Sequence, residues 1–168
     1  MEASPSPERP TSILFVCLGN ICRSPLAEGV FKHLADQKGL ADRFHVESAG
    51  TGSWHVGEEA DARSQRVAHD NGITLDSRAR QVEPGDLERF DHVVAMDRDN
   101  LRTLERMRDA QGGTRRIRLL RDFDPEEDGD EVPDPYYGGP GGFDDVFEMV
   151  RRSCEGLLED VEAARTAD

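Results

Sequence analysis

The sequence is poor in cysteine and has no long apolar run. Its three cysteines are odd in number and show no framework spacing, which argues against a disulfide-stapled scaffold and for reduced thiols. No apolar stretch approaches the length of a membrane-spanning helix. Residues 1–10 hold three prolines and no apolar core, so we predict a disordered tail rather than a secretory signal. We expect a cytoplasmic protein without a membrane partner, although export by another route stays open.

Basic residues are scarce relative to acidic ones. The 168-residue chain has 21 lysines and arginines against 35 aspartates and glutamates, a formal net charge of −14. A chain this acidic is poorly suited to binding nucleic acid through its overall field. Its length suits one domain with one core. We place this domain at residues 11–163 and a short C-terminal tail at residues 164–168.

Short β-rich runs and helical patterns alternate along the chain. The predicted strands are 12–17, 44–50, 92–96 and 116–120. The predicted helices are 24–39, 58–71, 98–110 and a last helix from residue 143 onward. Asp97 is the expected cap of the helix at 98–110. This order predicts an α/β domain whose central four-stranded parallel sheet is covered by helices on both faces.

The loop at residues 17–24, Cys-Leu-Gly-Asn-Ile-Cys-Arg-Ser, leads from a strand into a helix. Ligands of open parallel sheets bind at this edge, where unpaired N–H groups and the helix dipole attract anions. Gly19 permits a tight path that turns amides inward. Arg23 can hold two oxygens of a phosphate, and Ser24 is the expected N-cap of the helix. The loop therefore predicts a cradle for an oxyanion.

Cys17 lies at the base of this cradle. The positive potential of the loop favours the thiolate, which could attack a bound phosphate ester and form a phosphocysteine. The alternative is a small buried cysteine at the end of a strand, with an unrelated arginine on the surface.

Such a reaction needs a proton donor for the leaving oxygen. Asp134 lies between two prolines in the segment VPDPYYGG at residues 132–139, and it is the preferred candidate because the prolines restrict its backbone. Tyr136 and Tyr137 could form an aromatic wall for a flat substrate. A turn with exposed tyrosines is an equally good interpretation.

The segments VCLGNICRSP and DPYYGG, in this order and in so short a chain, resemble the low-molecular-weight protein tyrosine phosphatases. SAGTGSWHVG and LDSRARQV are also similar to that family, particularly to its bacterial members. The resemblance implies a flavodoxin-like three-layer sandwich, a monomer that hydrolyses phosphotyrosine, and no cofactor or metal. The implied partners are phosphotyrosine-containing proteins, and they could include a cognate tyrosine kinase.

The resemblance also implies roles for single residues. Cys17 would be the nucleophile, Arg23 would bind phosphate and stabilise the transition state, and Asp134 would act as general acid and then as base. Ser24 would hydrogen-bond the Cys17 thiolate. The amides of the loop would hold the phosphoryl oxygens; these residues are Leu18, Gly19, Asn20, Ile21, Cys22 and Arg23.

Further implied roles concern the support and the walls of the site. Asn20 would hold the loop in shape with a left-handed backbone, and Ser48 would support Asn20. Asn71 stands where many members have a histidine and would take over part of its support of the loop, so the support is expected to differ. Trp54 would form one wall of the cleft, opposite the tyrosines. Cys22 would close a reversible disulfide with Cys17 and so act as a redox switch.

Three other functions stay open. Arsenate reductases on this fold need a relay of further cysteines, which this chain lacks. Protein-arginine phosphatases tend to carry threonine where Ile21 stands, and the bulkier Ile21 favours a tyrosine ester. A non-catalytic oxyanion-binding module would not need Cys17, Arg23 and Asp134 together.

Overall fold

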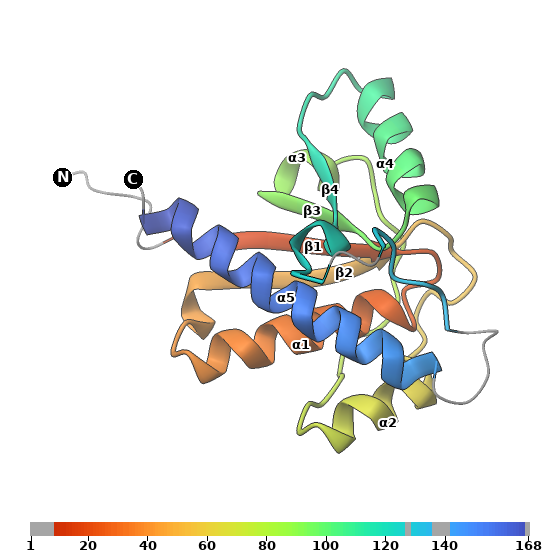
Figure 1. The fold of residues 1–168 in the computed structure, drawn as a ribbon. Coiled ribbons are helices and arrows are strands. Elements are labelled where there is room, and N and C mark those ends of the chain that lie inside the picture. The colour runs from red at the N-terminus through yellow and green to blue at the C-terminus, as the bar shows by residue number, and fades with distance from the viewer. Residues whose placement is uncertain (1–8, 127–128, 136–141, 167–168) are drawn as a thin grey trace.

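The computed structural model describes residues 9–126, 129–135 and 142–166, in which a parallel sheet lies between two layers of helices (Figure 1). Its four strands follow the order β2-β1-β3-β4 and are β1 (Thr11–Cys17), β2 (Phe44–Gly50), β3 (His92–Ala95) and β4 (Ile117–Leu119). The helices are α1 (Arg23–Gln37), α2 (Ala62–Asp70), α3 (Asp86–Arg89), α4 (Arg98–Ala110) and α5 (Gly142–Thr166), with 3₁₀ turns at Ala41–Arg43 and Leu120–Phe123. The predicted flavodoxin-like sandwich is confirmed.

The strand β1 lies in the middle of the sheet and is buried on both faces. Alternate side chains point in opposite directions along a strand. Ile13 and Phe15 therefore join the cluster under α1 and α5, whereas Leu14 and Val16 join the cluster under α3 and α4. The five buried positions, residues 13–17, form a continuous hydrophobic run, which is why the sequence predicted this strand well.

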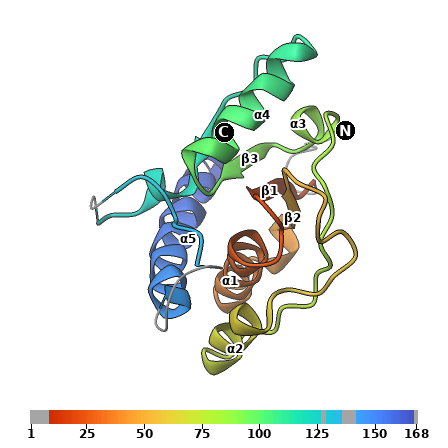
Figure 2. The ribbon, with the colours of Figure 1, turned by 90° about the vertical axis from the view of Figure 1, so that its right-hand side faces the viewer.

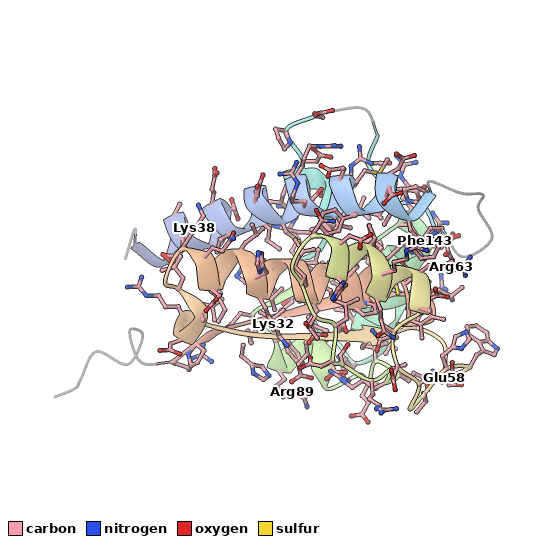
Figure 3. The ribbon with its side chains drawn as sticks, turned by 90° about the horizontal axis from the view of Figure 1, so that it is seen from below. Lys32, Lys38, Glu58, Arg63, Arg89 and Phe143 are labelled. Carbon is pink, nitrogen blue, oxygen red and sulfur yellow. The ribbon has the colours of Figure 1, made fainter. Side chains whose placement is uncertain are left out.

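Helices α1, α2 and α5 form the layer on one face of the sheet (Figure 3). Cys154 of α5 is fully buried against α1, with its Sγ 3.7 Å from the carbonyl oxygen of Ala27. At the other end of this layer, the Arg63 guanidinium of α2 lies 4.6 Å from the ring centroid of Phe143 in α5. No helix in the described part of the chain is long and apolar enough to cross a membrane.

Several boundaries differ from the predictions. Helix α2 begins at Ala62 rather than at residue 58, because the Asp61 side chain caps it by accepting the N–H of Arg63 at 2.8 Å. Helix α5 continues to Thr166, so its last turn occupies part of the predicted C-terminal tail. The short helix α3 was not predicted, since four residues are too few to show a helical period.

The order of the strands creates a switch point between β1 and β3. The chain places β2 on one side of β1 and then returns to place β3 and β4 on the other side. The loops after β1 and β3 therefore lead away from each other at the carboxyl ends of these strands (Figure 2). This is the edge at which open parallel sheets bind their ligands. Residues 17–24 and Asp97 lie at this edge.

Candidate active site

The loop after β1 turns sharply and enters α1. Asn20 has a φ of 58° and is the only described residue other than glycine in the left-handed region, a conformation that asparagine tolerates better than most residues. The end of β2 packs tightly against this turn. A Cβ on Gly50 would lie 2.8 Å from the carbonyl oxygen of Leu18, so the loop requires glycine at the position that pairs with Cys17.

The Cys17 sulfur is surrounded by hydrogen-bonding groups. Its Sγ lies 3.0 Å from the Ser24 hydroxyl and accepts the backbone N–H of Asn20 at 3.3 Å. The prediction that Ser24 is the N-cap of α1 is therefore wrong. The helix begins one residue earlier, at Arg23, and no side chain caps it. The serine hydroxyl instead faces the sulfur, as the family resemblance implied.

The hydrogen bonds around Asn20 set the direction of the serine proton. Asn20 Oδ1 accepts the N–H of Arg80 at 2.9 Å, and its Nδ2 donates to Ser24 Oγ at 2.8 Å. Because Ser24 Oγ accepts this bond, its own proton is free for donation to the Cys17 sulfur at 3.0 Å, which is nearer than its other acceptor, the carbonyl oxygen of Ala49 at 3.4 Å. The arrangement would stabilise a thiolate at Cys17.

Arg23 is almost completely buried and points its guanidinium into the site. Its Nη1 donates to Asp97 at 2.6 Å and to the carbonyl oxygen of Val132 at 2.9 Å, while Nη2 lies 3.6 Å from Asp134. Burial alone would lower the pKa of Arg23, but Cys17, Asp97 and Asp134 outweigh it and raise the pKa. The guanidinium is thus held charged and fixed in place.

Asp97 was predicted only as the cap of α4. One of its oxygens does accept the N–H of Asn100 at 2.8 Å, which confirms that prediction, and the other holds Arg23. Its contact with Arg23 could have been predicted from its place directly after β3, because the carboxyl ends of neighbouring parallel strands meet at one edge of the sheet.

A cavity of about 270 Å³ opens over the loop. Its lining includes the predicted nucleophile Cys17, the predicted phosphate-binding residue Arg23 and the predicted general acid Asp134. Trp54 also lines it, with 71% of its surface exposed. Tyr136 and Tyr137, predicted for the opposite wall, lie outside the described residues. The other lining residues are Leu18, Gly19, Ile21, Cys22 and His55, of which His55 was not predicted as a site residue.

Two predicted supports of the loop are placed differently. The Ser48 hydroxyl donates to Glu28 Oε1 of α1 at 2.6 Å, so the prediction that it supports Asn20 is wrong. Asn71 ends α2, and its Nδ2 donates to the carbonyl oxygen of Val67 at 2.8 Å, within its own helix. The amide of Arg80 provides the contact to Asn20 that we expected from Ser48.

Cys22 is a buried member of the same loop. Burial, followed by the negative charges of Asp61, Cys17 and Asp134, raises the pKa of Cys22 to about 12. Cys22 would therefore be a thiol and a poor nucleophile near neutral pH. The redox role of Cys22 stays a prediction. Closing a disulfide with Cys17 would need an external oxidant such as a peroxide, which would first oxidise the Cys17 thiolate.

Alkylation tests this difference between the cysteines. Near neutral pH, iodoacetamide is expected to modify Cys17, whose thiolate the surrounding hydrogen-bond donors would stabilise, and to leave Cys22 and the core residue Cys154 unmodified, as measured by mass spectrometry of peptides. Burial also raises the pKa of Cys154. Chain unfolded in urea is the control, in which all three cysteines should react. Modification of Cys22 as fast as that of Cys17 would contradict the prediction.

Comparison with known proteins gives one consistent result. The family model described as low molecular weight phosphotyrosine protein phosphatase matches residues 12–167. A low molecular weight protein-tyrosine-phosphatase of Streptomyces coelicolor is 47% identical over 148 residues, which cover 87% of this chain and 90% of the relative.

Solved structures agree with this match. The crystal structure of YfkJ from Bacillus subtilis has a TM-score of 0.87 and 41% identity, and the alignment covers 93% of this chain and 97% of that one. A Drosophila arginine phosphatase has a TM-score of 0.83 and 37% identity, with 89% and 96% of the chains covered. Fold, loop and relatives together establish that this chain belongs to the low-molecular-weight protein-tyrosine phosphatase family.

Proposed function

We propose that this chain hydrolyses phosphotyrosine in proteins through a phosphocysteine on Cys17. One observation carries the proposal: Cys17, Arg23 and Asp134 line a single cavity at the amino end of α1. A nucleophile, a phosphate-binding cation and a proton donor are the three groups that the reaction needs.

In the first step, the phosphate of the substrate enters the loop, and its oxygens are held by the loop amides and Arg23. The Cys17 thiolate attacks phosphorus, the sulfur–phosphorus bond forms, and the bond to the tyrosine oxygen breaks. Protonated Asp134 donates its proton to that oxygen.

Asp97, at 2.6 Å from the guanidinium, is the principal ionic partner of Arg23, whereas Asp134 is 3.6 Å away.

In the second step, water attacks the phosphocysteine. The Asp134 carboxylate accepts a proton from this water, phosphate leaves, and the sulfur–phosphorus bond breaks. The Ser24 hydroxyl, 3.0 Å from Sγ, would donate to the departing thiolate and make it a better leaving group.

A depth requirement supports specificity for phosphotyrosine. Cys17 and Trp54 both line the cavity, but Cys17 is 2% exposed whereas Trp54 is 71% exposed, so the sulfur is the deeper of the two groups. A phenyl ring can span this depth and contact the indole. Phosphoserine is too short to reach Cys17 while its peptide stays outside.

The first experiment is phosphate release from peptides that carry phosphotyrosine, phosphoarginine or phosphoserine, measured in the presence of a chelator. We expect release from phosphotyrosine to dominate. Release confined to phosphoarginine would replace the proposal with the activity of the Drosophila relative. No release from any peptide would leave an oxyanion-binding module.

Ile21 is the residue that we expect to disfavour phosphoarginine. It is 7% exposed and lines the cavity beside Cys17. Replacing Ile21 by threonine is expected to raise the ratio of kcat/KM for phosphoarginine over phosphotyrosine by about tenfold, since small changes in a pocket wall are worth roughly 1–3 kcal/mol. Val56→Thr, an exposed apolar position outside the cavity lining, is the matched control. An unchanged ratio in Ile21→Thr would contradict the prediction.

The setting of the reaction is also part of the proposal. A tyrosine kinase must supply the substrate, because the reaction consumes phosphotyrosine. We propose a cytoplasmic site of action, where a reducing environment keeps Cys17 a thiol. We further propose a monomer, since one chain supplies every group of the mechanism; sedimentation at the mass of a dimer would contradict this.

A further inference from the structure

A buried carboxylate outside the cavity lining is connected to the active-site loop through Arg80. Asp86, the first residue of α3, is 0% exposed. Its Oδ2 accepts the Arg80 Nη1 at 2.9 Å and the backbone N–H of Glu83 at 2.7 Å, and its Oδ1 accepts the Arg89 guanidinium. Burying a carboxylate is costly unless such donors compensate it. The protein therefore holds Asp86 in one position.

Arg80 connects this carboxylate to β2. The same guanidinium that binds Asp86 also reaches Glu47 Oε1 at 3.1 Å. Burial would lower the pKa of Arg80, but Asp86 and Glu47 outweigh it and raise the pKa. Two carboxylates from different elements therefore hold the Arg80 guanidinium in place.

The backbone of Arg80 in turn holds the active-site loop. Its carbonyl oxygen accepts the N–H of Gly50 at 2.8 Å, and its N–H donates to Asn20 Oδ1 at 2.9 Å. Asn20 donates its own N–H to the Cys17 sulfur and its Nδ2 to Ser24. The left-handed backbone of Asn20, with φ of 58°, costs of order 1–3 kcal/mol and persists only where surrounding contacts impose it.

We propose that Asp86 and Arg80 are positioning residues for the nucleophile: the Asp86–Arg80 ion pair fixes the backbone amide that holds Asn20, and Asn20 places its donors and Ser24 around the Cys17 sulfur. The inference rests on the proposed role of Cys17. Neither side chain lines the cavity, so both act through the loop and not through the substrate.

If Asp86 acts by its charge, its removal shifts the pH dependence of Cys17 alkylation in one direction; if it acts by positioning the loop, its removal shifts it in the opposite direction. Removing its negative charge alone would favour a thiolate and would move Cys17 alkylation to lower pH. Releasing the loop would take the Asn20 N–H and the Ser24 hydroxyl away from the sulfur, which disfavours the thiolate and moves alkylation to higher pH. If Asp86 only stabilised the fold, its replacement would leave the pH dependence of Cys17 alkylation and the kcat per folded molecule unchanged.

The test uses Asp86→Asn in the full chain, with Asp91→Asn as matched control. Asp91 also accepts a backbone N–H and a hydroxyl, both from Ser12, at 2.9 and 3.2 Å. It precedes β3 at the amino edge of the sheet, away from the active-site loop. The measurements are the pH dependence of Cys17 alkylation, kcat and KM for a phosphotyrosine peptide, and urea unfolding to correct for the folded fraction.

For Asp86→Asn, we expect alkylation to shift to higher pH and kcat to fall between about ten- and a hundredfold, the upper figure being the loss for reacting groups misplaced by about 1 Å. Asp91→Asn should leave both unchanged. A shift to lower pH, or an unchanged kcat per folded molecule, would overturn the proposal. If Asp86→Asn does not fold, Arg80→Ala and its conservative counterpart Arg80→Lys take its place, with partial recovery expected only for lysine. Alkylation does not require turnover, so an inactive wild type would sink the proposed function without deciding this result.

Discussion

Replacing Cys17 by serine is expected to abolish phosphotyrosine hydrolysis, with kcat lower by about 10⁴-fold or more, as when other enzymes lose their nucleophile. A serine hydroxyl would meet the same donors, Asn20 N–H and the Ser24 hydroxyl. It would remain protonated near neutral pH and so would be a poor nucleophile. Steady-state hydrolysis of a phosphotyrosine peptide measures the effect.

The control for this variant is Cys154→Ser. Cys154 is fully buried between α5 and α1 and does not line the cavity. Its replacement is expected to lower the free energy of unfolding while kcat per folded molecule stays unchanged. Cys17→Ser should show the opposite pattern and should still bind inorganic phosphate through the loop amides and Arg23. Turnover by Cys17→Ser within about tenfold of wild type would rule out the phosphocysteine.

Replacing Asp134 by asparagine is expected to lower kcat for a phosphotyrosine peptide by about 10²–10³-fold, within the usual contribution of a general acid. Asparagine keeps the shape of the side chain but cannot donate an acidic proton to the tyrosine oxygen. The loss should be much smaller with 4-nitrophenyl phosphate, because nitrophenolate is a weaker base and leaves without protonation. The dependence on the leaving group therefore separates acid catalysis from a change in binding.

Asp130→Asn is the matched control in the same segment. Asp130 pairs with Arg98 at the surface and does not line the cavity. It is expected to leave both substrates unaffected. An equal loss with both substrates in Asp134→Asn would show that Asp134 positions Arg23 or the substrate and does not donate a proton.

The layers of the fold follow from local patterns. The predicted range 98–110 coincides with α4, since Asp97 caps its first turn and the helix has a strongly segregated apolar face. The strand β1 was predictable because it is apolar at both faces. Helix α3 and the 3₁₀ turn after β4 were missed, because elements of four residues have no measurable period.

The active site likewise has residues that the sequence predicts and contacts that it does not. Cys17, Ser24 and Arg23 lie within one short loop, so strand, loop and helix together indicate their proximity. Asp134 was singled out by its two flanking prolines and by the family resemblance, and it lies on the wall of the cavity. Its role as general acid stays a prediction until the variants are measured.

The sequence by itself determined which segment could cradle an oxyanion, since the chemistry and the turn are encoded in neighbouring residues. The tertiary structure alone decided what surrounds that loop. Asp97 reaches Arg23 only because β3 lies beside β1, and the Arg80 amide replaces Ser48 at Asn20 only because the segment after α2 runs along the end of β2. Contacts of this kind depend on strand order and register, which are set by packing of the whole core and leave no local signal in the chain.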